Sequence, residues 1–411
     1  MKQTATRQVK MLNINILLVM STLLIALGGC STIEKQSKKI ADNPNPFQSD
    51  LLPVAPHANK DVTAILKYLD ALPKRENAKC LTGQDIGVRG EPELAKTYFQ
   101  KSVVELDRVS GHRPAVLEYA TFHDTGRWLT LSEQESMQKE IIERSREGHL
   151  IYLNLRPAHP AGIPLMLEEG IPVWANVVAN GKAPGFHLSV DSVIKPEGKY
   201  YKAYREILDY AANYMKPLEK DGVPLLFEIF NEFNGNWNWF GKAEPEEFKK
   251  LWRYTYHYFA HERKFTNLLF VLEYNSNTLI RENDTVGIYY PGDDCVDILG
   301  FDFYHSNPGD KYVGIYNELC AIGKPVAMAE YGPQLRDYRK MHKVRVGEAV
   351  NIWDNMVQVE FTKTHYPKCC FFIRWGFDWA MISQNNPKEF MNDPLWANLE
   401  HLKRDRLSFA R

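Results

Sequence analysis

The chain has 411 residues, of which 44% are hydrophobic, 12% aromatic and 25% charged. Its 50 lysines and arginines nearly balance its 51 aspartates and glutamates, so the formal net charge is −1. This composition is typical of a globular protein with a large core. It lacks the basic excess that nucleic-acid-binding proteins normally carry, so we expect no nucleic-acid partner.

The first 30 residues differ from the rest and predict a secretory signal. Basic residues precede an apolar stretch from Ile14 to Leu27, and Gly28, Gly29 and Cys30 follow it. An apolar stretch this short, ending in small residues, is typical of a signal peptide rather than of a spanning helix. The Leu-Gly-Gly-Cys ending resembles the lipobox of bacterial lipoproteins, which implies cleavage before Cys30 and acylation of its thiol. An uncleaved anchor helix is the alternative.

Position 31 is a serine, where an aspartate would be the usual signal for retention in the inner membrane. We therefore expect an exported lipoprotein, attached to the membrane by its N-terminal lipid and, in a Gram-negative cell, to the outer membrane. Residues 31–60 are polar, contain prolines and show no helical or strand periodicity, which predicts a flexible tether.

Five of the six cysteines lie beyond Cys30, and an exported protein can pair them as disulfides in ways that the sequence does not specify. No Cys-x-x-Cys pair occurs, which argues against a zinc–cysteine site. Two histidines four residues apart, His257 and His261, lack the glutamate that a zinc-protease motif requires after the first histidine. We expect no metal, no cofactor and a monomeric protein.

From about residue 61 to the end, short apolar runs alternate with amphipathic stretches. Eight runs have the length and composition of buried parallel strands: 80–86, 115–121, 150–155, 225–230, 268–274, 296–304, 326–331 and 370–377. Three stretches between them are expected to be helices: 202–216, 245–263 and 343–364. This alternation predicts a single α/β domain folded as a (β/α)8 TIM barrel over residues 61–411.

A doubly wound sheet is the competing fold class. The Gly-rich motifs that bind dinucleotides or nucleotide phosphates on such sheets are absent from the sequence, which weakens the nucleotide-binding interpretation.

Two glutamates lie at strand ends, where a barrel places its active site. Glu232 follows the fourth predicted strand, and Glu330 lies near the end of the seventh. Two carboxyl groups facing each other across a cleft are what glycoside hydrolysis requires, since one protonates the leaving oxygen and the other attacks the sugar or activates water. An ion-paired residue beneath the rim is the structural alternative for Glu330.

Several stretches, in this order, resemble glycoside hydrolase family 26, the clan A family known for β-mannanases. They are Asn231-Glu232-Phe233-Asn234-Gly235-Asn236-Trp237-Asn238-Trp239, Pro245-Glu246-Glu247-Phe248, Tyr290-Pro291-Gly292-Asp293-Asp294, Gly300-Phe301-Asp302-Phe303-Tyr304, Ala329-Glu330-Tyr331-Gly332 and Phe372-Ile373-Arg374-Trp375. The resemblance covers roughly residues 80 to 380.

The resemblance implies a barrel that hydrolyses a polysaccharide with retention, through a double displacement. It makes Glu232 the acid/base and Glu330 the nucleophile. It implies that Tyr304 hydrogen-bonds the nucleophile, that Trp375 lies under the sugar at the cleavage subsite and that Trp237 lines the cleft. Aromatic neighbours of Glu232 are also expected to exclude water and so raise the pKa of the acid.

The chain departs from the family at two places. Before the acid/base the family has Arg-x-x-His-Glu, whereas this chain has Glu228 in the arginine position and Asn231 in the histidine position. Asparagine before the acid/base is the general clan A arrangement, and it implies a hydrogen bond to the sugar 2-hydroxyl. After the third strand the family tends to have Trp-His-Pro, whereas this chain has Arg156 in the histidine position, followed by His159.

Because the charges of Arg156 and Glu228 are exchanged relative to the family, a rewired ion pair between them is one hypothesis. Outward-facing side chains are the alternative. Both residues and His159 are candidates for contacting substrate. His305, after Tyr304, could contact substrate or order its loop, and Trp174 could line a distal subsite.

The sequence thus predicts a lipid-anchored, retaining endo-β-glycosidase resembling a β-mannanase, with a polysaccharide as its substrate. The departures leave open an enzyme that trims the cell's own exopolysaccharide or capsule. A transglycosylase differs only in the access of water to the intermediate. A non-enzymatic polysaccharide-binding lipoprotein is a further alternative, although a binding protein has no need of both carboxyl groups.

Overall fold

The computed structural model describes residues 49–87, 92–120, 129–160, 188–236, 238–241, 243–345 and 348–405. Ser49–Arg411 cluster as one compact unit. The expected signal peptide, Cys30 and residues 31–48 of the expected tether lie outside the described residues. Within the described ranges, no helix is both long and apolar enough to cross a membrane.

Ten parallel strands form one sheet, and eight of them close into a barrel. The barrel strands are β2 (Gly83–Gly87), β3 (Val116–Ala120), β4 (Leu150–Leu155), β5 (Leu225–Ile229), β6 (Leu268–Asn275), β7 (Ile298–Tyr304), β8 (Val326–Gly332) and β9 (Cys369–Arg374). The hydrogen-bonded order is β10-β1-β9-β2-β3-β4-β5-β6-β7-β8, and the pairing of β8 with β9 closes the ring. Two short strands, β1 (Cys80–Leu81) and β10 (Trp396–Ala397), extend the sheet beside β9. Each predicted strand overlaps one barrel strand, which confirms the (β/α)8 prediction and excludes the doubly wound sheet.

The barrel strands are rich in leucine, isoleucine, valine and phenylalanine because both faces of a parallel barrel strand are covered. Strands β3, β4, β5, β6, β8 and β9 are buried along their whole length. Gly300 on β7 is required by close packing inside the barrel, since a Cβ there would lie 2.8 Å from the Ala329 Cβ and 3.2 Å from the Glu273 Cβ.

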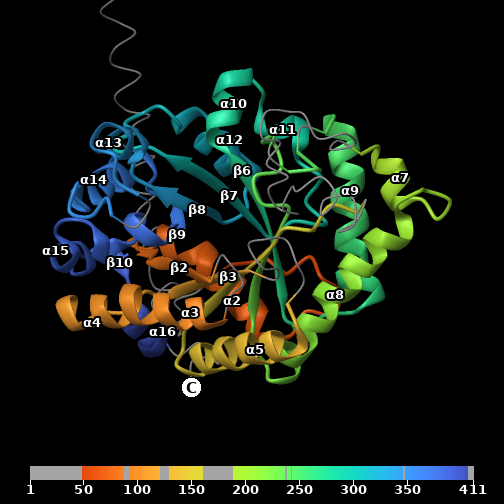
Figure 1. The fold of residues 1–411 in the computed structure, drawn as a ribbon, viewed down its shortest axis with the longest axis horizontal. Coiled ribbons are helices and arrows are strands. Elements are labelled where there is room, and N and C mark those ends of the chain that lie inside the picture. Colours follow the sequence, from red (N-terminus) through yellow and green to blue (C-terminus); the bar gives the residue numbers. More distant parts are fainter. Residues whose placement is uncertain are drawn as a thin grey trace, which may run out of the picture. The chain divides into compact units, whose positions relative to one another are not determined.

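Helices surround the strands (Figure 1). They are α2 (Lys60–Ala71), α3 (Pro92–Tyr98), α4 (Glu105–Ser110), α5 (Leu131–Arg146), α7 (Val190–Ile194), α8 (Tyr201–Lys220), α9 (Pro245–His257), α10 (Ser276–Glu282), α11 (Val286–Tyr289), α12 (Val313–Ile322), α13 (Arg336–His342), α14 (Met356–His365), α15 (Pro387–Met391) and α16 (Leu399–Arg404). Short 3-10 turns cover Leu72–Lys74, Phe377–Trp379 and Met381–Ser383, and π-helical turns cover Phe99–Val104 and Tyr258–Glu262.

Two of the three predicted helices are confirmed, and the third was predicted too long. Helix α8 spans the predicted 202–216, while α9 and the π-helical turn that follows it together span the predicted 245–263. The helix predicted over 343–364 begins only at Met356. Asn351 adopts a positive φ of 55°, and the backbone N–H groups of Ile352 and Trp353 donate to the Gln384 side chain. The Gln384 side chain thus takes the place of the backbone carbonyl groups that would accept these hydrogen bonds in a helix. The apolar pattern of the sequence could not indicate this bond.

Residues before the predicted tether boundary at residue 60 already bond to the barrel. The Val54 N–H donates to Asp297 Oδ1 at 2.8 Å, and the Asn59 N–H donates to the carbonyl of Thr266 at 2.7 Å. Asp297 and Thr266 precede β7 and β6, so residues 54–59 contact the amino-terminal face of the barrel. The second part of the predicted tether is therefore part of the folded domain.

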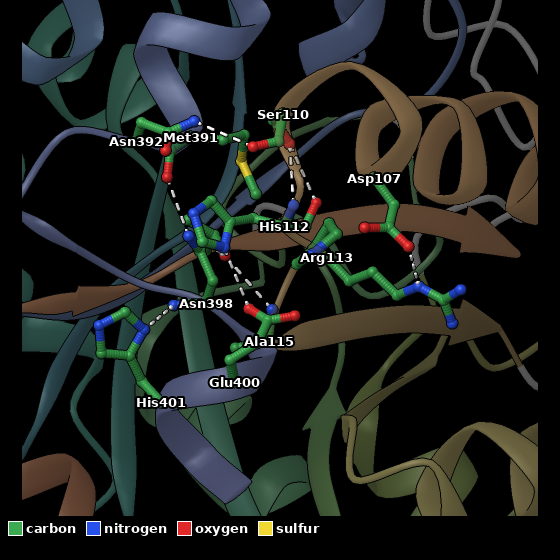
Figure 2. A network of polar contacts seen from close by, with 12 residues as sticks. Asp107, Ser110, His112, Arg113, Ala115, Met391, Asn392, Asn398, Glu400 and His401 are labelled. Atoms are coloured by element: carbon green, nitrogen blue, oxygen red, sulfur yellow. Dashed lines mark hydrogen bonds and ion pairs between the residues drawn. The ribbon is translucent and has the colours of Figure 1, made fainter. Parts of the chain in front are cut away.

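A polar network joins the C-terminal segment to the end of α4 and to Thr82, between β1 and β2 (Figure 2). Asn398 Nδ2 donates to the carbonyl of Met391 at 2.9 Å, and its Oδ1 accepts from Thr82 Oγ1 at 2.9 Å. Asn392 Nδ2 donates to the carbonyl of Ser110 at 3.1 Å. These bonds hold β10 beside β1 at the amino-terminal end of the barrel, away from the strand ends that carry the predicted site.

The five cysteines of the folded domain are free thiols and form no disulfide with one another. The sequence had left their pairing open. Cys80, Cys369 and Cys370 are fully buried, and burial raises the pKa of each thiol above its usual value. Thiols in such surroundings stay protonated and act as small apolar core residues.

Candidate active site

Glu330 lies on β8 at the carboxyl end of the barrel, with only 4% of its surface exposed. The Tyr304 hydroxyl, at the end of β7, donates to Glu330 Oε1 at 2.5 Å. Asn231 Nδ2 approaches Glu330 Oε2 at 3.5 Å, and Arg156 Nη2 lies 3.8 Å from the same oxygen. The contact between Tyr304 and Glu330 is the one that the family resemblance implies.

Glu232 follows β5 on a strained turn. Phe230 and Glu232 have φ angles of 63° and 49°, a left-handed region that costs a non-glycine residue about 1–3 kcal/mol. The turn brings the half-buried Glu232 carboxyl over the mouth, where Asn275 Nδ2 donates to its Oε1 at 2.6 Å. Strain of this kind persists only where the surroundings hold it, and here Asn234 and Asn275 fix the turn through two reciprocal hydrogen bonds.

Asp302, also at the end of β7, forms the third member of the group. Carboxylate oxygens of Glu232, Asp302 and Glu330 all lie within 4.8 Å of one another. Burial, and then the neighbouring Glu232, raise the pKa of Asp302 well above its usual value, and the two side chains are hydrogen-bonded. Burial and this neighbour therefore favour the protonated form of Asp302.

Three carboxylates this close could also accept a divalent cation. Amide and phenol donors already serve the same oxygens, since Asn275, Asn231 and Tyr304 donate to them. Because these donors already bond oxygens of all three carboxyl groups, we assign no metal to the cluster.

A second carboxyl pair lies one layer below, between β5 and β6. Glu228 and Glu273 are each 1% exposed and hydrogen-bonded to each other. Asn154 Nδ2 donates to Glu228 at 2.6 Å, and Asn231 Nδ2 donates to Glu273 at 2.8 Å. Burial raises the pKa of both carboxyl groups, so this layer is also partly protonated.

The ion pair hypothesised between Arg156 and Glu228 does not form. Arg156 instead pairs with Glu330, and Asn154 occupies the position beside Glu228. The reason is register: Asn154 is directly opposite Glu228 on the neighbouring strand, whereas Arg156 lies beyond the end of β4 and reaches the mouth.

Aromatic side chains lie on the segments that follow β4, β5 and β9. Trp375 follows β9 and is half-buried, with the Arg156 guanidinium 5.8 Å from its ring centroid. Trp239 is 2% exposed and donates from its indole N–H to the carbonyl of Pro157 at 2.8 Å. His159 is buried edge-on to Trp239, with 6.2 Å between ring centroids. Phe233, the residue after Glu232, is 1% exposed and stacks on Phe248 of helix α9.

The remaining predicted residues have different outcomes. His305 is half-buried on the catalytic face, and its Nδ1 accepts from the Asn307 N–H at 3.2 Å, a contact that orders the loop. Trp237 and Trp174 lie outside the described residues, so their predicted roles stay predictions.

Sequence reasoning missed Asn154, Glu273, Asn275 and Asp302. A signal for them was present, because each is a polar residue within or at the end of an otherwise apolar strand: Glu273 in Leu-Leu-Phe-Val-Leu-Glu-Tyr-Asn and Asp302 in Gly-Phe-Asp-Phe-Tyr. A buried polar group must be satisfied, so such positions indicate partners across the barrel.

A closed barrel with two carboxyl groups at the ends of its fourth and seventh strands defines the class of (β/α)8 glycoside hydrolases. The chain belongs to glycosyl hydrolase family 26, whose model matches residues 54–378. It is 26% identical over 363 residues to a mannan endo-1,4-beta-mannosidase of Bacillus subtilis strain 168, covering 84% of this chain and 88% of the relative.

A mannan endo-1,4-beta-mannosidase A and B of Caldalkalibacillus mannanilyticus is 25% identical over 367 residues, covering 84% of this chain. The chain spans 61% of that relative's length. A solved Bacillus subtilis mannanase has the same fold, with a TM-score of 0.65, 22% identity and coverage of 85% of this chain and 96% of the other. The structure of a β-mannanase from a symbiotic protist of the termite Reticulitermes speratus also has this fold, with a TM-score of 0.65 and 20% identity. The match covers 85% of this chain and 97% of the other.

Proposed function

We propose that the protein is a retaining endo-β-glycosidase that resembles the β-mannanases. The observation that carries the proposal is the proximity of the Glu232 and Glu330 oxygens, within 4.8 Å. Retaining enzymes hold their carboxyl groups about 5–5.5 Å apart, whereas inverting enzymes need about 6.5–9.5 Å to admit a water molecule. The spacing leaves no room for that water, which supports direct attack by a carboxylate.

In the first step, Glu330 attacks the anomeric carbon and the glycosidic bond breaks, while Glu232 gives its proton to the leaving oxygen. In the second step, water attacks the anomeric carbon, Glu232 takes the proton of that water, and the ester bond to Glu330 breaks. Tyr304 and Asn231 donate to Glu330 and so hold it for attack, and Asn275 fixes Glu232. These steps use only side chains of the chain itself.

β-1,4-linked mannan is the first substrate that we propose, because relatives that match most of the chain have names stating this activity. Asn231 adds support for a sugar at the cleavage subsite. Its Nδ2 is bonded to carboxylates, while its buried Oδ1 has no partner within the described residues and is suited to accept from a sugar hydroxyl.

Incubation of the domain from residue 49 with a polysaccharide panel tests this proposal. We expect β-mannan to be cut internally, and proton NMR of the first product to show a new reducing end in the β configuration. The panel includes the host cell's own exopolymer as a second arm and an excess of sugar acceptor to detect transglycosylation. A first product in the α configuration would contradict retention, and binding without cleavage of any member would contradict enzymatic function.

We further propose that the protein is an exported lipoprotein anchored through Cys30. The Leu-Gly-Gly-Cys ending of the apolar N-terminal stretch supports this proposal. Replacing Cys30→Ser is expected to abolish incorporation of labelled palmitate and to move the protein from the membrane fraction to the soluble fraction. Ser31→Thr serves as the control that keeps the thiol. Unchanged lipid labelling in the Cys30 variant would contradict the anchor.

A further inference from the structure

Glu330 lies in a strongly acidic environment. The ionisable groups that face it or its carboxyl neighbours come from strands β2 to β7 and from the segments that follow β4 and β5: Asp85, Glu118, Tyr152, Arg156, Glu228, Glu232, Glu273, Asp302 and Tyr304. Burial, and then the Glu232 carboxylate, raise the pKa of Glu330 to about 8, while Arg156 and Tyr304 act in the opposite direction. A nucleophile must be ionised to attack, so these surroundings oppose the reaction unless a positive charge offsets them.

Arg156 is the cation that faces Glu330 among the described residues. Its Nη2 lies 3.8 Å from Glu330 Oε2, and its side chain is 31% exposed. Arg374 on β9, the next strand along from β8, does not serve this purpose, because its guanidinium donates to Asn355, Gln358 and the carbonyl of Trp379. Burial opposes the charge on Arg156, but the surrounding carboxylates, Glu330 first among them, hold its pKa above the usual value.

The position of this cation follows from the two departures in the sequence. Glu228 occupies the place on β5 where a basic residue was expected, and it is satisfied by Asn154 and Glu273. Arg156 approaches the nucleophile from the end of the neighbouring strand β4 instead.

We propose that Arg156 is a positioning residue that favours the ionised form of Glu330 within this buried acid cluster, at a distance of 3.8 Å, and thereby sets the acidic limb of the pH profile. Contact with a substrate group is not needed for this role. The inference rests on the proposed function, because it requires Glu330 to be the nucleophile. Tyr304 and Asn231 also donate to Glu330 but carry no charge, so they cannot replace the Coulomb contribution of Arg156.

The test is the pH dependence of covalent labelling. A dinitrophenyl 2-deoxy-2-fluoro-β-mannoside, or the same probe built on the sugar that the panel selects, carries a leaving group that needs no proton. The rate of labelling therefore reports the ionisation of the nucleophile alone. The rate is measured from pH 4 to pH 10 for the wild type, Arg156→Gln and Arg156→Lys, and mass spectrometry locates the label on the peptide that contains Glu330.

We expect the acidic limb of Arg156→Gln to move about one pH unit upward, with the labelling rate recovering at alkaline pH, because an opposite charge within about 4–6 Å lowers a carboxyl pKa by about 1–3 units. Arg156→Lys keeps the charge and is expected to keep the limb of the wild type. Arg205→Gln is the matched control, since Arg205 is a half-buried arginine on helix α8 that pairs with Glu262 at 2.8 Å and lies outside the mouth. It should leave the limb unchanged.

Each outcome supports or contradicts the role of Arg156. Suppose that the label lies on Glu330 in the wild type but the acidic limb of Arg156→Gln does not move, or the labelling rate falls equally at every pH. That result contradicts this inference and leaves the proposed function standing. If Arg156→Gln does not fold, Arg156→Lys becomes the test, because it keeps the positive charge. An acidic limb displaced from that of the wild type in Arg156→Lys would contradict the inference. A label on a residue other than Glu330, or none, contradicts the proposed function and this role with it.

Discussion

Replacing Glu330→Ala is expected to lower kcat on the polysaccharide by about five orders of magnitude, because removing a nucleophile eliminates the covalent route altogether. Added azide should partly restore turnover of a dinitrophenyl β-glycoside. The small anion fits the space that the carboxylate leaves below the sugar and attacks the anomeric carbon once, so the product is the α-glycosyl azide. Reducing-sugar release and NMR of the azide product measure both effects.

Glu232→Ala is the matched control for this experiment, since it removes the carboxyl group on the other side of the cleft. Here Glu330 still forms the covalent intermediate, and azide then attacks that intermediate. Two successive inversions give the β-glycosyl azide. The two variants thus separate the roles of the two carboxyl groups. If Glu330→Ala gave the β-glycosyl azide and Glu232→Ala the α-glycosyl azide, the nucleophile and the acid/base would be exchanged. Full activity in either variant would contradict a catalytic role for the residue replaced.

Replacing Trp239→Ala is expected to lower the free energy of unfolding by about 3–5 kcal/mol, the usual cost of truncating a buried tryptophan. The side chain is 2% exposed and packs edge-on against Tyr204, with 5.8 Å between ring centroids. Its indole N–H also bonds the carbonyl of Pro157, so it ties the loop that carries Glu232 to the loop that carries Arg156. Chemical unfolding followed by tryptophan fluorescence and circular dichroism measures the loss.

Trp239→Phe separates the two contributions, because it keeps most of the packing and removes the hydrogen bond. We expect it to cost about 1 kcal/mol from the lost bond and the smaller ring. In the alanine variant kcat should fall as well, since the two loops lose their common support. Unchanged stability of Trp239→Ala would show that the loop is not held in this way.

The strands, and the location of Glu232 and Glu330 at strand ends, were predictable because they depend on short-range features of the chain. Apolar runs of strand length recur between amphipathic segments, and parallel strands in a closed barrel place their carboxyl ends on one face. Glu232 and Glu330 follow from that rule once the fourth and seventh strands are counted. The structure brings both to the mouth, with their oxygens within 4.8 Å.

The errors arose where a side chain distant in sequence replaces a local interaction. The Gln384 side chain takes the N–H groups of Ile352 and Trp353, so the predicted helix starts later. Asp297 binds the N–H of Val54, so the folded domain starts earlier than expected. Composition gives no indication of either partner, because each bond joins segments that only the closed barrel brings together.

The sequence by itself determined the barrel, the order of its strands and the two carboxyl groups at the mouth, because periodicity and strand counting are properties of the chain alone. The tertiary structure decided which polar and charged side chains pair with one another. Asn154 rather than Arg156 stands beside Glu228, and Arg156 stands beside Glu330, since strand register and the length of each strand set these distances. Electrostatic partnership depends on separations of a few ångströms across the barrel, and no local pattern encodes them.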